Sequence, residues 1–130
     1  MLDMTATIAA VSTAPGLGGR AIVRLTGPEA IALAAGVFVA DGVPLGRRRG
    51  FTATAGTVAT GELSLPARAY VFVAPHSYTR QPLVELHVPG HPIAADMVLG
   101  ALLARGARAA APGEFTQRAF LSGRIDLSAA

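Results

Sequence analysis

The chain has 130 residues, 52% of them hydrophobic, and a formal net charge of +3. This length fits one domain with its own core, and the composition excludes a wholly disordered chain. The absence of cysteine excludes a disulfide framework and a thiolate metal site, and no apolar run reaches the length of a membrane span. All 11 basic residues are arginine, and their modest excess over acids permits nucleic-acid contact without requiring it.

The first half of the sequence mixes short β-branched runs with glycine and proline signals. G-P-E at residues 27–29 predicts a helix start, because proline suits a first helical position and glutamate favours the positive helix end. The arginine run at 47–49 is typical of a solvated turn. The predicted elements are strands at 6–11 and 21–26, a glycine loop at 14–19 between them, a helix over 27–39 and an exposed loop over 41–50.

The second half predicts a hairpin and then alternates strands with helices. The second helix is apolar on most sides, so we expect it to be well buried. The predicted elements of this half are strands at 51–63 and 67–74 with a turn near 64–66, a strand at 83–88, a helix at 93–105 ended by Gly106, a short edge strand at 107–110 and a helix at 112–121. In the last helix, Glu114 and Arg118 are four residues apart and are expected to pair. We therefore predict an α+β fold, a single domain with a mixed or antiparallel sheet and about three helices.

Several common sites are disfavoured by the residue types present. The loop at 16–19 is not a phosphate-binding P-loop, because that motif needs a lysine and a following helix, and the chain has no lysine. A dinucleotide fingerprint fails because a strand follows the glycines. His76, His87 and His91 lack ligand spacing for a metal, and no serine-hydrolase elbow is present.

A carboxylate within a strand is the most informative feature. Leu83, Glu85 and His87 share one face of the predicted strand. A half-buried carboxylate costs free energy unless a donor meets it. Two interpretations stay open: a structural ion pair with an arginine, or a carboxylate that binds N–H donors of a heterocycle. Arg24, inside another predicted strand, raises the same question with the opposite charge.

Six stretches resemble one family in the right order along the whole chain. They are residues 7–11 (TIAAV), 14–19 (APGLGG), 22–28 (IVRLTGP), 75–79 (PHSYT), 84–87 (VELH) and 112–127 (PGEFTQRAFLSGRIDL). The last is similar, almost without a break, to the signature P-G-E-F-T-x-R-A-F-x-N-G-K-x-D-L of the MnmE/TrmE proteins. The chain thus resembles the N-terminal domain of these tRNA-modifying GTPases.

The resemblance implies a fold similar to folate-binding domains of the aminomethyltransferase type, with residues 1–121 forming the domain and 122–130 beginning a truncated helical domain. It implies a homodimer that binds a tetrahydrofolate derivative, 5-formyl- or 5,10-methylenetetrahydrofolate, through Arg24, Glu85 and Arg124. Full-length members are cytoplasmic, carry a G domain that uses GTP, Mg²⁺ and K⁺, and modify C5 of the tRNA wobble uridine with an FAD-dependent partner. This chain lacks the G domain, so we do not expect it to hydrolyse GTP alone.

The sequence departs from the family pattern around the expected pocket. Residues 80–82 are R-Q-P where the family usually has G-E-D, residues 89–91 are P-G-H where it has H-G-G, and Arg124 stands where lysine is usual. Arginine keeps the charge there but changes the geometry. Two alternatives therefore stay open: a stand-alone folate-dependent one-carbon transfer protein, and a divergent dimerisation module without ligand.

Overall fold

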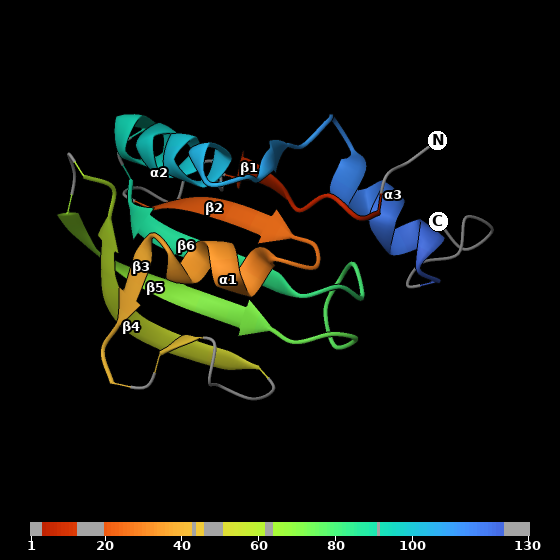
Figure 1. Ribbon diagram of the computed structural model, residues 1–130, viewed down its shortest axis with the longest axis horizontal. Coiled ribbons are helices and arrows are strands. Elements are labelled where there is room, and N and C mark those ends of the chain that lie inside the picture. The colour runs from red at the N-terminus through yellow and green to blue at the C-terminus, as the bar shows by residue number, and fades with distance from the viewer. Residues whose placement is uncertain are drawn as a thin grey trace.

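The computed structural model describes residues 4–12, 20–42, 44–45, 51–61, 64–90 and 92–123. Across these residues the chain forms a seven-stranded mixed sheet and three helices, which confirms the predicted α+β class (Figure 1). The strands are β1 (Ile8–Ser12), β2 (Arg20–Thr26), β3 (Phe38–Ala40), β4 (Thr52–Ala59), β5 (Ser64–Phe72), β6 (Leu83–Pro89) and β7 (Arg108–Ala109), and the helices are α1 (Ala30–Ala35), α2 (Pro92–Ala104) and α3 (Glu114–Leu121).

The strands lie in the order β3-β4-β5-β6-β2-β1-β7, and β6 is at the centre. Neighbouring strands are antiparallel except β1 and β7, which are parallel. The register of β2 on β6 places Arg24 directly opposite Glu85, and the register of β5 on β6 places Tyr70 on the other side of Glu85. The sheet thus brings together a cation and an acid that are 61 residues apart in the sequence.

Alternation along each strand gives the sheet two faces of different character. On β6, Val84, Leu86 and Val88 are buried in the core, whereas Glu85 and His87 lie on the opposite face and are only partly buried. Helices α1 and α2 cover the first face, and their apolar side chains form one core with it (Figure 1). We call the other side, which carries Arg24 and Glu85, the open face.

Two predicted boundaries were wrong. The helix predicted over 27–39 ends at Ala35, and Phe38–Ala40 instead form the edge strand β3 on β4. Glycine and β-branched residues at 36–39 are poor helix formers, so pairing with β4 prevails. The hairpin is confirmed, but the turn predicted near 64–66 is not, because β5 begins at Ser64 and Pro66 pairs with Thr57.

Helix α2 is buried on one side only, so the prediction that it is well buried was too broad. Ala95, Val98 and Leu102 lie in the core, whereas Ile93 is 62% exposed. Other predictions are confirmed: Gly106 follows α2 with φ +120°, β7 is an edge strand, and α3 ends at Leu121.

Two buried charged residues hold α3 in place. The Arg118 side chain is fully buried, and its guanidinium donates to Gln81 Oε1 at 3.0 Å and to the Thr26 carbonyl at 3.5 Å. Its Nη2 lies 3.5 Å from Glu114 Oε2, which confirms the predicted pair four residues apart. Glu114 also accepts two hydrogen bonds from Arg108 and one from the Ala111 backbone N–H at 2.9 Å. The buried charges are therefore paired and hydrogen-bonded, as burial requires.

Hydrogen bonds hold the segment between β5 and β6 against the end of β2. Thr26 donates its hydroxyl hydrogen to the Pro82 carbonyl at 2.9 Å, and its oxygen lies 2.6 Å from Thr79 Oγ1. The Gly27 N–H donates to the same Pro82 carbonyl at 3.1 Å. These bonds position the neighbouring Tyr78 at the edge of the open face.

Some predictions lie outside the described residues. They concern the glycine loop at 16–19, the arginine run at 47–49, His91 and Arg124. The start of a helical domain at 122–130 also stays a prediction. In the described ranges, no helix is long and apolar enough to cross a membrane.

Gly27 and Gly100 offer a matched pair of substitutions. Gly27 has φ +141°, and a Cβ added there would lie 2.6 Å from the Thr7 Cα, whereas a Cβ at Gly100 would meet no atom within 4 Å. Gly27→Ala should lower the free energy of unfolding by about 2 kcal/mol or more, because it adds both strain and a backbone clash. Gly100→Ala, inside α2, should raise it by about 0.5–1 kcal/mol. Urea unfolding measures both, and shifts of the same sign would contradict this account of Gly27.

The Glu114 carboxyl should make stability depend on pH. The hydrogen bonds from Arg108 hold its pKa below the usual value of 4.5; burial raises the pKa, but the Ala111 N–H and the charges of Arg108 and Arg118 lower it further. Its contribution is therefore fully present above the unfolded pKa and is lost as the pH falls through the folded pKa. At neutral pH, Glu114→Gln should cost about 2 kcal/mol.

The test compares urea unfolding of the parent chain and Glu114→Gln at neutral and acidic pH. The difference between the two free energies should shrink in acid. Asp96→Asn, an exposed change on α2, serves as the control and should leave the difference near zero throughout. A Glu114→Gln effect of constant size at all pH values would show that the carboxylate charge is not what holds α3.

Candidate ligand-binding site

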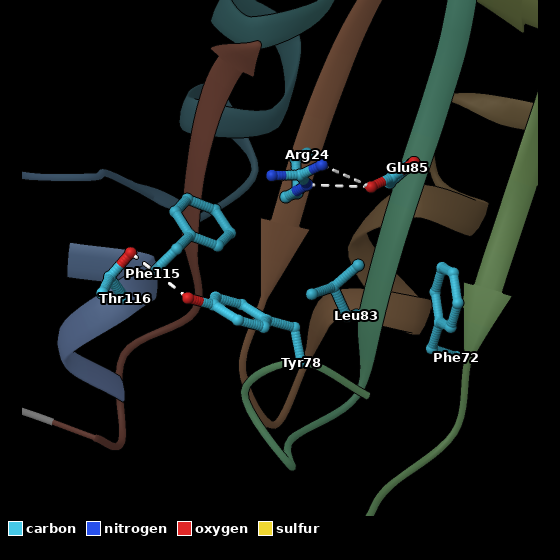
Figure 2. Close-up of a pocket in the computed structure, with 7 residues that line it drawn as sticks. All are labelled: Arg24, Phe72, Tyr78, Leu83, Glu85, Phe115 and Thr116. Atoms are coloured by element: carbon cyan, nitrogen blue, oxygen red, sulfur yellow. Dashed lines mark hydrogen bonds and ion pairs between the residues drawn. The ribbon is translucent and has the colours of Figure 1, made fainter. Parts of the chain in front are cut away.

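A hollow of about 410 Å³ lies on the open face, between the β2–β6 pair and α3 (Figure 2). Its volume suits a small organic ligand. Strands β2, β5 and β6, the segment between β5 and β6, and α3 all contribute to its lining. The lining residues are Arg24, Phe72, Tyr78, Leu83, Glu85, Phe115 and Thr116.

An ion pair between adjacent strands forms the polar part of the hollow. Arg24 donates from Nε at 2.9 Å and from Nη2 at 2.6 Å, and both bonds end on Glu85 Oε2. The arginine side chain is 34% exposed and the glutamate side chain 19% exposed. The pair is therefore neither a solvated surface bridge nor a fully buried one, and it remains accessible from the hollow.

His87 binds the second oxygen of the same carboxylate. Its Nε2 lies 3.1 Å from Glu85 Oε1. Burial raises the pKa of the Glu85 carboxyl, but the hydrogen bonds from His87 and Arg24 and their charges outweigh burial, so the pKa falls below its usual value. Glu85 is thus a carboxylate at neutral pH, with hydrogen-bond acceptors directed at a cavity.

Aromatic side chains form the walls around this carboxylate. The Arg24 guanidinium carbon lies 6.0 Å from the centre of the Phe115 ring, at the outer limit of a cation–π contact. Tyr78 reaches toward α3, where its hydroxyl lies 3.4 Å from Thr116 Oγ1, and Phe72 lines the opposite side (Figure 2). Flat apolar walls around one charged acceptor favour a planar heterocycle that carries N–H donors.

The structure brings together two of the three residues proposed from the sequence. Arg24 and Glu85 are paired in the hollow, whereas Arg124 lies outside the described residues. Sequence reasoning did not assign Phe72, Tyr78 or Phe115 to the site. Tyr78 and Phe115 lie in stretches that resemble the family, whereas Phe72 lies outside those stretches and had no signal in the sequence. His87 was placed correctly on the Glu85 face by strand alternation. In the described residues, no three potential ligands cluster to hold a metal ion.

Comparison with known proteins places these residues in a family. Residues 7–124 match the family model described as the N-terminus of the GTP-binding protein TrmE. A protein from Symbiobacterium thermophilum named tRNA modification GTPase MnmE is 49% identical over 127 residues, which are 95% of this chain and 28% of that protein. Proteins of the same name from Chloroflexus aurantiacus and Moorella thermoacetica are each 46% identical and cover 98% and 100% of the chain.

The chain spans 28–29% of the length of these curated relatives. The family model covers nearly all of the chain, including the strands that carry Arg24 and Glu85 and all of α3. The chain therefore belongs to the family of TrmE N-terminal domains.

Proposed function

We propose that this chain is the tetrahydrofolate-binding, dimerising N-terminal domain of a cytoplasmic GTPase that modifies C5 of the tRNA wobble uridine with an FAD-dependent partner. The relatives that it resembles are named tRNA modification GTPases. The observation that carries the folate proposal is the Arg24–Glu85 pair inside an aromatic-walled hollow. The remaining parts rest on family membership.

The carboxylate of Glu85 suits the edge of a pterin ring, which presents neighbouring N–H donors. A carboxylate offers about four acceptor positions. Arg24 uses two of them on Oε2, and His87 uses one on Oε1. One position is open, so two parallel bonds to a pterin require Arg24 to release one of its own.

Arg24 has room for such a change. Its side chain is 34% exposed, and Phe115 lies beside its guanidinium. A guanidinium that turns from Glu85 toward the ligand keeps a charge-assisted bond and can orient a ring carbonyl. Arg124 remains a predicted third contact, to the polar or glutamate part of the ligand, from the same or the partner subunit.

Two other functions explain part of the same geometry. In a dimerisation module without ligand, the Arg24–Glu85 pair is structural only. A stand-alone one-carbon transfer protein would also bind folate. The length of the native reading frame separates it from the proposed parent, because a G domain would follow this chain. Folate affinity separates both folate-binding proposals from the purely structural one.

Glu85→Gln tests whether Glu85 binds the ligand. The change removes a charge-assisted acceptor whose bonds are worth about 1.5–3 kcal/mol each. Affinity for 5-formyltetrahydrofolate, measured by calorimetric titration, should fall about tenfold or more while the chain stays folded.

Asp96→Asn serves as the matched control. It removes one carboxylate from the exposed side of α2, on the helix-covered side of the sheet, and should leave folate affinity unchanged. Unchanged affinity in Glu85→Gln would show that the ligand binds elsewhere. Absence of folate binding by the parent chain, with Glu85→Gln losing thermal stability, would instead support the structural pair.

The open face also offers an apolar surface for a second copy. Phe51, Tyr70 and Phe72 form an aromatic patch, with ring centres of Phe51 and Phe72 4.9 Å apart and those of Phe51 and Tyr70 6.5 Å apart. Phe51 is 59% exposed. Aromatic residues are enriched at protein interfaces. Because Phe72 also lines the hollow, a dimer through the aromatic patch would place the folate sites near the interface.

The exposed Ile93 on α2 lies on the other side of the sheet, which provides a control for the dimer. Phe51→Asp should weaken dimerisation at least about tenfold, because a charge in an interface centre is poorly tolerated. Ile93→Asp should leave it unchanged. Sedimentation across a dilution series measures both. A parent chain that is monomeric at high micromolar concentration would contradict the dimer, and dissociation by Ile93→Asp alone would place the interface on α2.

A further inference from the structure

A second hollow of about 390 Å³ lies on the open face at the opposite end of β6 from the first. Leu83, at the start of β6, lines the first hollow, and Pro89, at its end, lines the second. Glu85 and His87 lie between them on the same face. The two hollows therefore follow each other along one strand.

The second hollow is basic. Arg20 from β2 and Arg68 from β5 both line it, on either side of β6, and both are exposed. Arg68 pairs in register with His87, and Arg20 with Pro89. Among the described residues, no acidic side chain forms an ion pair with Arg20 or Arg68. Two cations that have no ion-pair partner in the described part of the chain, one on either side of β6, create a positive potential that attracts an anion.

His87 lies between the two hollows and contacts residues of both. Its Nε2 contacts Glu85, and it also lines the second hollow. Its Nδ1 is buried and has no hydrogen-bond partner in the described part of the chain. Buried polar atoms are seldom left unpaired without a reason. The ring centre lies 4.4 Å from that of Tyr70, which is in register with Glu85, so the two rings form an aromatic surface beside the carboxylate.

The spacing fits a ligand with three unlike parts. Pro89 is six positions after Leu83, and a strand rises about 3.4 Å per residue, so the ends of β6 lie about 20 Å apart. From Glu85, the register position of Arg68 is about 7 Å along the strand and that of Arg20 about 14 Å. Along this length the open face presents the Glu85 carboxylate with the Tyr70 and His87 rings beside it, and further along the guanidinium groups of Arg68 and Arg20. A pterin, an aminobenzoyl ring and glutamyl carboxylates follow the same order in a folate.

We propose that the second hollow is an anion subsite for the glutamyl carboxylates of the ligand, with Arg20 and Arg68 as the residues that bind them. This inference rests on the proposed folate function. It assigns a direction to the ligand, with the tail toward Pro89. It also implies that ligands with several glutamyl residues bind more tightly than those with none.

Two ligands and three single variants test the subsite by calorimetric titration of the 130-residue chain. The ligands are 5-formyltetrahydrofolate with three glutamyl residues and 5-formyltetrahydropteroate, which has none. The variants are Arg20→Gln, Arg68→Gln and the control Arg105→Gln, an exposed arginine just after α2 that changes the net charge equally. For the parent chain, we expect about tenfold tighter binding of the triglutamate.

Arg20→Gln and Arg68→Gln should each weaken triglutamate binding several-fold and leave pteroate binding unchanged. Arg105→Gln should change neither. Pteroate binding also reports that each variant is folded. Equal parent affinities for the two ligands, or equal losses in all three variants, would overturn the subsite while the folate function stands. Failure of the parent to bind either ligand would overturn the folate function and the subsite together.

Discussion

A single buried guanidinium joins the three segments that build the site. Arg118 on α3 binds the end of β2 through the Thr26 carbonyl and the segment before β6 through Gln81. Phe115 and Thr116 lie on the same helix, and Tyr78 lies in the same segment as Gln81. The positions of the residues that line the hollow thus depend on the buried charge of Arg118, which does not itself line the hollow. A buried cation is stable only while its acceptors stay in place. Arg118 therefore restricts how far α3 can shift relative to β2 and Gln81.

Gln81 shows how the chain accommodates a departure from the family pattern. The amide accepts from Arg118 through Oε1 and donates from Nε2 to the Met4 carbonyl at 2.9 Å. A carboxylate at this position would add charge to the Arg118 site but could not donate to Met4. Arg80, where the family usually has glycine, has φ +63°. That is a left-handed backbone, which glycine adopts freely and residues with a Cβ adopt at a cost.

The sequence predicted local features better than long-range ones. Alternation placed Glu85 and His87 on one face of β6, and spacing paired Glu114 with Arg118, because both depend on neighbours in the chain. The partner of Glu85 depended on the β2–β6 register, which no local pattern reveals. A place inside a predicted strand and the family resemblance singled out Arg24 from 11 arginines, but neither established its pairing with Glu85. The predicted end of the first helix at residue 39 was wrong for a related reason, since the strand β3 that replaces its last residues exists only because β4 pairs with it.

The strand order has a consequence for synthesis. As the chain leaves the ribosome, β4 and β5 can pair early because they are close in the sequence, and so can β1 and β2, whereas the pairing of β2 with β6 and of β1 with β7 must wait for distant segments. Pairing between distant segments is slow because loop closure precedes any gain from contacts. Ile8 meets Arg108 only after most of the chain has emerged. The outer edges of β1 and β2 therefore stay unpaired until β7 and β6 have been made, and the two members of the Arg24–Glu85 pair come together late in folding.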